Sequence, residues 1–226
     1  MKKNFLCEIS YILGLVLLAI GTALMTKANF GVSMIVAPAY ILHLKVSELL
    51  PWFSFGVAEY AIQALLLVAT VVAVGKFKWY YLFSFVTAIL YGLALDGVLL
   101  VLDLLVWEHL ALRIGAFAVG LLLCTTAIAL LINTYLAPEV YELFVKELSA
   151  KRGVSFGRVK IIYDVASLLV AVVMTVFFFG WWPLQGIGIG TVVTAILNGW
   201  LISNISRWLN KKFNFVDGLP LRKYFS

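Results

Sequence analysis

Long stretches without a charged residue limit this chain to a membrane fold. Residues 9–26, 79–95, 114–138 and 165–206 contain no Asp, Glu, Lys or Arg. A helix needs about 20 apolar residues to cross the hydrocarbon core of a bilayer. The last stretch is long enough for two such helices, and the Gly-Trp-Trp-Pro sequence at 180–183 is typical of a break between them.

The composition agrees with this interpretation. Hydrophobic residues make up 64% of the 226 positions and charged residues 12%, and the mean hydropathy is +1.06. Soluble domains carry about 25% charged residues. Because the apolar runs are continuous and do not alternate with polar residues, they favour helices over barrel strands. The sequence predicts an all-α polytopic membrane protein whose six spans lie near 9–29, 53–75, 79–102, 111–135, 158–179 and 185–206.

Two parts of the chain nearly repeat each other. Val86-Thr-Ala-Ile-Leu-Tyr-Gly92 returns as Val193-Thr-Ala-Ile-Leu-Asn-Gly199, and Ser54-Phe55-Gly56 returns as Ser155-Phe156-Gly157, each about a hundred residues later. We therefore expect one membrane domain over 1–226, with a first repeat at about 9–104, a second at about 111–208 and a cytoplasmic tail at 209–226. Each repeat holds three spans, so the second enters the bilayer from the opposite side. Inverted repeats of this kind recur in secondary transporters.

The basic residues predict the orientation. With the N-terminus inside, every Lys and Arg except Lys27, Lys45 and Arg113 falls on the cytoplasmic side. This distribution follows the positive-inside rule, so both termini are expected in the cytoplasm. It also accounts for the net charge of +6. We therefore expect the lipid bilayer, and no nucleic acid, as a partner.

Each repeat also has a semi-polar segment between its first and second spans, at 32–52 and 137–153. We favour a helix lying in the membrane interface over a re-entrant segment or gate. The reason is that Glu142, Lys146 and Glu147 of the second segment need water or charged partners.

Four polar residues fall at similar depth inside the predicted spans. Aligning the Ser-Phe-Gly triplets pairs Gln63 with Asp164, and aligning the longer repeats pairs Tyr91 with Asn198. Polar groups in hydrocarbon need partners, so these side chains should face the interior, where we expect them to bind a substrate or ion. Two structural alternatives stay open. Asp164 has the i, i+4 spacing to pair with Lys160, and the other three residues can form hydrogen bonds between helices.

A second polar set lies near the ends of the predicted spans. Lys27 ends span one, Glu59 opens span two and Asp96 approaches the end of span three, all toward the outer face. Lys160 corresponds to Glu59 in the second repeat. These four residues are candidates for a gate or ion pair, and solvated, snorkelling side chains are the alternative.

Small residues predict where helices come close together. Gly14, Gly21 and Ala23 give span one a thin face for a neighbouring helix. The Gly-Ile-Gly-Ile-Gly-Thr sequence at 186–191 lacks the Gly-Lys-Ser/Thr of a phosphate loop. We expect close packing, or a flexible start to span six, at this position.

Four short motifs resemble those of the YczE/YitT-type bacterial integral membrane proteins. They are Gly21-Thr-Ala-Leu-Met25, Ala28-Asn-Phe-Gly31, Ser155-Phe-Gly157 and Gly186-Ile-Gly-Ile-Gly-Thr191. Without the soluble C-terminal domain of the YitT-like members, the chain is similar to the shorter YczE-like branch. The resemblance implies a bacterial inner-membrane location, a role in transport or membrane maintenance, and acidic residues matched by Asp164 and Asp96. It supplies no substrate.

The sequence shows no catalytic constellation, so we expect no enzyme, cofactor or metal site. His43 and His109 fall in predicted outer loops without metal-binding spacing. We expect a small-solute transporter or permease that works by alternating access at the repeat interface. The alternatives are a substrate-binding subunit of an ATP-driven importer, with an ATPase module as partner, and a non-transporting scaffold or regulator. A second copy of the chain is a further candidate partner.

Overall fold

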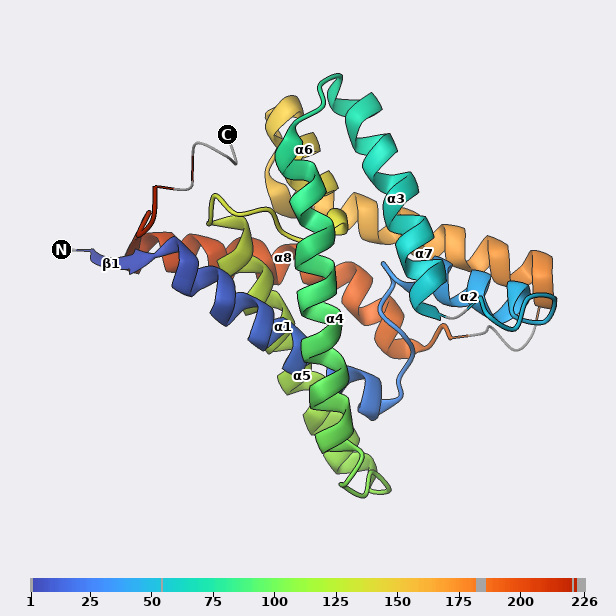
Figure 1. The fold of residues 1–226 in the computed structure, drawn as a ribbon. Helices are drawn as coiled ribbons and strands as arrows, with labels where there is room; N and C mark the ends of the chain where they lie inside the picture. Colours follow the sequence, from blue (N-terminus) through green and yellow to red (C-terminus); the bar gives the residue numbers. More distant parts are fainter. Residues whose placement is uncertain (1, 54, 182–185, 221, 223–226) are drawn as a thin grey trace.

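A computed structural model describes residues 2–53, 55–181, 186–220 and 222. The described chain is mostly helical (Figure 1). Its helices are α1 (Cys7–Ala28), α2 (Ala37–Val46), α3 (Phe55–Val74), the short 3-10 helix η1 (Trp79–Leu82), α4 (Phe83–Leu102), α5 (Leu110–Ile132), α6 (Val140–Arg152), α7 (Phe156–Phe179) and α8 (Ile189–Lys212). The Asp96 side chain, although on α4, lies outside the described part.

Six of these helices are long and apolar enough to cross a membrane: α1, α3, α4 together with η1, α5, α7 and α8. The six-span prediction is therefore confirmed at the level of helix length and composition. The largest difference is at the end of span six, which was expected at residue 206 but continues as α8 to Lys212. The helix can continue through its basic residues because their charged ends reach water by snorkelling, so a charge marks the limit of the apolar part and not of the helix.

The structure adds a small β-sheet that the all-α prediction missed. Strand β1 (Lys3–Leu6) pairs in parallel with β2 (Phe213–Val216), so that Lys3 lies opposite Phe213. This pairing joins the segment before α1 to the segment after α8. Glu8 stabilises the turn that follows β2, because its carboxylate accepts hydrogen bonds from the backbone N–H groups of Gly218 and Leu219. Part of the expected tail at 209–226 is thus fixed against the helices.

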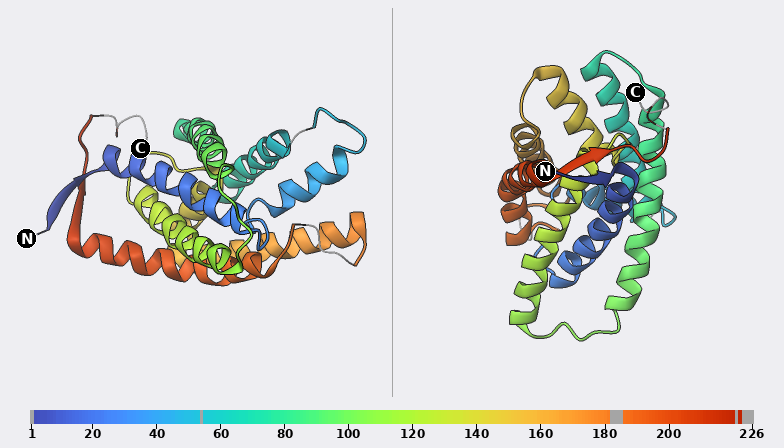
Figure 2. Two further views of the ribbon diagram at one scale, coloured as in Figure 1. Left: turned by 90° about the horizontal axis from the view of Figure 1, so that it is seen from below. Right: turned by 90° about the vertical axis from the view of Figure 1, so that its left-hand side faces the viewer.

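The core forms around α5, which lies between α1 and α8 (Figure 2). Glycine lets α1 and α5 approach backbone to backbone. A Cβ on Gly21 would lie 2.8 Å from the Gly120 carbonyl oxygen, and one on Gly120 would lie 2.7 Å from the Gly21 carbonyl oxygen. The expected thin face on the first span is therefore confirmed.

A second close crossing joins α7 to α8. A Cβ on Gly199 would lie 2.5 Å from the Gly157 carbonyl oxygen and 2.5 Å from Ile161 Cγ1. Gly92, which holds the place of Gly199 in the first repeat, has no atom within 4 Å of such a Cβ among the described residues. The two copies of the motif therefore pack differently.

The glycine-rich segment before α8 packs against the loop after α1. Val32 N donates a hydrogen bond to the Gly186 carbonyl at 2.8 Å, and Gly190 N donates to the Phe30 carbonyl at 2.9 Å. Gly31 has a φ of 111°, and a Cβ there would collide with Thr191 and Gly188. The close helix packing expected at 186–191 is present at Gly190, where a Cβ would lie 2.7 Å from the Phe117 ring of α5, whereas Gly188 packs on the loop after α1.

Helices α2 and α6 are packed against the spans. α2 contacts α3 and α7, and α6 contacts α3 and α7 as well. Glu142 of α6 is only 2% exposed. Of the two ways to satisfy this residue, water or a charged partner, the structure shows the charged partner, Lys160.

Candidate functional site

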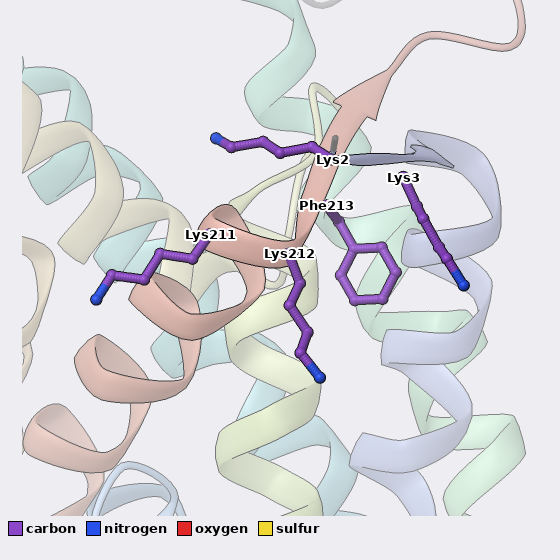
Figure 3. A pocket seen from close by; sticks show the side chains of 5 residues that line it. All are labelled: Lys2, Lys3, Lys211, Lys212 and Phe213. Carbon is purple, nitrogen blue, oxygen red and sulfur yellow. The ribbon is translucent and has the colours of Figure 1, made fainter.

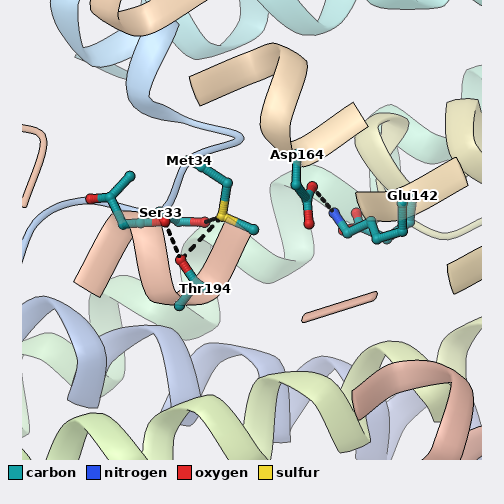
Figure 4. A network of polar contacts seen from close by, with 7 residues as sticks. Ser33, Met34, Glu142, Asp164 and Thr194 are labelled. Carbon is teal, nitrogen blue, oxygen red and sulfur yellow. Dashed lines mark hydrogen bonds and ion pairs between the residues drawn. The ribbon is translucent and has the colours of Figure 1, made fainter. Parts of the chain in front are cut away.

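One buried lysine binds two carboxylates between α6 and α7. Lys160 Nζ lies 2.9 Å from Asp164 Oδ1 and 3.5 Å from Glu142 Oε1. Lys160 and Asp164 are fully buried, so water does not screen this network. Figure 4 shows Asp164 and Glu142 reaching toward the same ammonium group.

Two more carboxylates come close to this triad. Glu59, on α3, accepts a hydrogen bond from the Tyr141 hydroxyl at 3.0 Å and another from Gln63. Glu139, which caps the start of α6, is 6% exposed and interacts electrostatically with Glu142, Glu59 and Lys160. We call Glu59, Glu139, Glu142, Lys160 and Asp164 the central charged cluster.

The central charged cluster has four acids and one base. Burial, followed by repulsion from Glu142 and Glu59, raises the pKa of Glu139 well above its ordinary value of 4.5. A site with this balance favours uptake of a proton or another positive charge, because either one reduces the repulsion among the carboxylates.

Several buried oxygens at and around the cluster have no hydrogen-bond partner within the described residues: Gln63 Oε1, Glu142 Oε2, Asp164 Oδ2 and Asn198 Oδ1. Leaving a buried polar atom unsatisfied typically costs about 1–3 kcal/mol. Acceptors left open in this way are suited to a ligand that donates hydrogen bonds.

The four predicted binding residues do not form one contact set. Asp164 belongs to the central charged cluster, and Gln63 touches it through Glu59. Tyr91 is half-buried, bonds to Thr22 and interacts electrostatically with Glu139 and Glu59. Asn198 is buried on α8, beside the crossing with α7. The structure leaves their binding roles untested.

The predicted gate residues are separated. Lys27 forms an ion pair with Asp103 at the far end of α4, while Glu59 turns inward to Tyr141. Lys160 is part of the central charged cluster, and the Asp96 side chain is outside the described residues. The pairing of Lys160 with Asp164, which the sequence offered as a structural alternative, is present.

The sequence did not predict that Glu139 and Glu142 belong to the candidate site. Glu139 and Glu142 follow Pro138 directly after a charge-free run, and that position was the available signal. A related feature is Glu147, whose Oε2 accepts a hydrogen bond from the Tyr81 hydroxyl at 2.7 Å and whose Oε1 accepts one from Tyr80. Buried carboxylates thus hold α6 at Glu142, through Lys160, and at Glu147, through Tyr80 and Tyr81.

Two cavities lie away from the central charged cluster. One, of about 510 Å³, is lined by Lys2, Lys3, Lys211, Lys212 and Phe213 (Figure 3). The other, of about 350 Å³, is lined by residues 29–31 and 186–189. Among the described residues, no group of three or more His, Cys, Asp or Glu side chains is placed to hold a metal ion.

Comparison with known proteins gives one match. The model of a family described as "Family of unknown function (DUF6198)" matches residues 6–207. No curated protein and no solved structure matches the chain. The matched region includes all six candidate spans up to the last turns of α8.

Proposed function

Since the chain belongs to the family of unknown function DUF6198, we propose that it carries a small solute across a membrane, coupled to a proton or another cation. The observation that carries this proposal is the central charged cluster. Ionisable residues inside membrane proteins are costly, and they commonly mark ion or substrate pathways. Here two acids, Asp164 and Glu142, pair with one lysine between α6 and α7, and two more, Glu59 and Glu139, interact electrostatically with Glu142.

In this proposal the cluster exchanges positive charge during transport. Asp164 and Glu142 hold Lys160 when no cation is present. A proton or cation that neutralises a carboxylate weakens that hold and allows the helices to move. Gln63, Tyr91 and Asn198 bind the solute through their polar groups, two of which have open acceptors.

The helix contacts support an inverted repeat. If α1–α4 correspond to α5–α8, the contact of α1 with α4 matches that of α5 with α8. The contact of α3 with α6 likewise matches that of α7 with α2, and α2–α3 matches α6–α7. A pseudo-twofold relation between two copies produces such a matched set, and in this proposal the central charged cluster lies near their interface.

The strongest departure from this match involves α7 and α8. α7 and α8 cross closely at Gly157 and Gly199, whereas their counterparts α3 and α4 diverge (Figure 1). In alternating access, the two repeats have different conformations in each state, and each repeat adopts the conformation of the other when the state changes. We propose that the structure is one of two states, and that α3 and α4 close together in the other.

The distribution of Lys and Arg supports a cytoplasmic location for both termini. The motif resemblance described above supports a bacterial inner membrane as the location. Open acceptor atoms in the interior favour a ligand-binding role over a scaffold, in which buried groups would be fully paired.

The experiment begins with a thermal-shift screen of purified protein against a metabolite library. The solute that stabilises the protein is then followed into proteoliposomes, with and without an imposed pH or cation gradient. We expect gradient-driven uptake, and we expect D164N to lose its dependence on the gradient. D103N is the matched control, because Asp103 is exposed and also pairs with a lysine.

Gradient-driven uptake that is unchanged in D164N would remove the central charged cluster from the mechanism. Uptake that needs ATP and a copurified ATPase would assign the chain to an ATP-driven importer instead.

A further inference from the structure

We propose that the cavity formed where β1 and β2 meet binds the headgroup of an anionic phospholipid. Its lining combines Lys2 and Lys3, before α1, with Lys211, Lys212 and Phe213, at the end of α8. This site shares no residue with the central charged cluster, so the inference does not depend on the transport proposal.

The β-sheet creates the site. Lys2 and Lys211 are far apart in the sequence, and the pairing of Lys3 with Phe213 brings the two basic segments together. Figure 3 shows the lysine side chains extending from the two segments, with the Phe213 ring between Lys212 and Lys3. The sheet therefore gathers four positive charges around one cavity of about 510 Å³.

These charges are unpaired within the described part of the chain. All four lysines are exposed, and none forms an ion pair with a described carboxylate. The carboxylate that follows β1, Glu8, is already occupied by Tyr135 and by the backbone of Gly218 and Leu219. No described acid lines the cavity. An anion is the complementary ligand.

The surroundings favour a lipid over free phosphate as the source of that anion. The cavity adjoins the ends of two candidate spans, α1 and α8, where a bilayer would place its headgroups. Trp208, 52% exposed, lies one turn before Lys212 and stacks with its ammonium group at 4.6 Å, as suits a residue at a membrane interface. Basic clusters directly beside a span typically bind anionic lipids.

Phe213 adds an apolar wall. Its ring packs on Phe5 at 5.4 Å between centroids, so the aromatic surface is held in place. An anionic phospholipid presents both a charge for the lysines and apolar acyl chains for this ring. Inorganic phosphate offers only the charge.

Isothermal titration calorimetry of the full chain in neutral detergent tests the proposal. The probes are short-chain phosphatidylglycerol, short-chain phosphatidylcholine and inorganic phosphate. We expect phosphatidylglycerol to bind most tightly, and we expect K2Q/K3Q/K211Q/K212Q to weaken its binding at least about tenfold.

The control variant, K76Q/K151Q/R152Q/R158Q, removes the same charge from exposed basic residues in the loop after α3, at the end of α6 and at the start of α7, on the same predicted side. It should bind phosphatidylglycerol as the unchanged protein does. Thermal unfolding of both variants checks that each is folded. If both variants lost the same phosphatidylglycerol affinity, the binding would come from general charge attraction, and the proposed site would be contradicted. Phosphatidylcholine or inorganic phosphate binding as tightly as phosphatidylglycerol would overturn the lipid assignment.

Discussion

Lys160 Nζ lies 2.9 Å from Asp164 Oδ1, one helical turn further along α7, and neither side chain is exposed. Glu142 approaches the same nitrogen from α6 at 3.5 Å. A single cation therefore links two helices through their carboxylates, inside a protein most of whose surface is apolar. This link couples the charge state of the interior to the packing of α6 against α7.

Replacing Lys160 with methionine should strongly destabilise the protein. The change leaves the Asp164 and Glu142 carboxylates buried without their cation, and breaking a buried pair in this way typically costs 3–5 kcal/mol, so we expect a loss of about that size. The measurement is the free energy of unfolding in mixed micelles at neutral pH. K45M is the control, because the pair of Lys45 with Glu48 is exposed and should contribute about 1 kcal/mol or less. Equal losses in K160M and K45M would contradict the account.

The repeated glycines Gly199 and Gly92 should respond oppositely to alanine. A Cβ on Gly199 would meet the backbone oxygen of Gly157 at 2.5 Å, so G199A should lose about 1–3 kcal/mol through overpacking. A Cβ on Gly92 would meet no described atom within 4 Å, so G92A should gain up to about 1 kcal/mol of stability from helix propensity. Thermal unfolding of the two variants measures both effects.

The same pair of glycines tests the proposed second state. If α3 and α4 close during transport, a leucine at Gly92 should leave the described state stable but slow solute uptake. Uptake by G92L equal to that of the unchanged protein would argue against closure at this position.

Glu139 and Glu147 should give opposite pH dependences. Burial raises the pKa of Glu139 above 4.5 in the folded protein, so its contribution to stability is present at low pH and is lost as pH rises. E139Q, which stays neutral, should therefore become more stable relative to the unchanged protein as the pH rises from 4.5 toward neutrality.

Glu147 supplies the opposite case. Burial acts to raise its pKa, but hydrogen bonds from Tyr80 and Tyr81 and the charge of Lys78 lower it overall. The contribution of Glu147 to stability is present above the pKa that this residue has in the unfolded chain, and it is lost as the pH falls. E147Q should be destabilised at neutral pH, and the difference should shrink on acidification. Parallel pH curves for E139Q and E147Q would contradict these environments.

The sequence predicted what depends on local pattern. Charge-free runs identified the spans because helix length and apolarity are local properties, and Gly21 identified a close crossing because only a missing side chain permits one. The i, i+4 spacing of Lys160 and Asp164 likewise anticipated their contact.

What failed depends on distant partners. The need of Glu142 for water or a charged partner was predicted, but its partner Lys160, eighteen positions later, was not identified. The four-residue strands β1 and β2 pair the segment before α1 with the segment after α8, a contact between distant parts of the chain that no local pattern reveals. Lys27 of α1 pairs with Asp103 at the end of α4, whereas Glu59 of α3 bonds to Tyr141 of α6. The residues predicted as one outer set therefore have different partners.

Thiol labelling in intact cells tests the inverted repeat most directly. Trp52 and Ser155 are exposed and lie just before the first helical turns of α3 and α7. W52C and S155C are made separately in a chain whose buried Cys7 and Cys124 are replaced by alanine. The account predicts that a membrane-impermeant reagent labels W52C from outside, and S155C only after the cells are permeabilised. Labelling of both from the same side would contradict it.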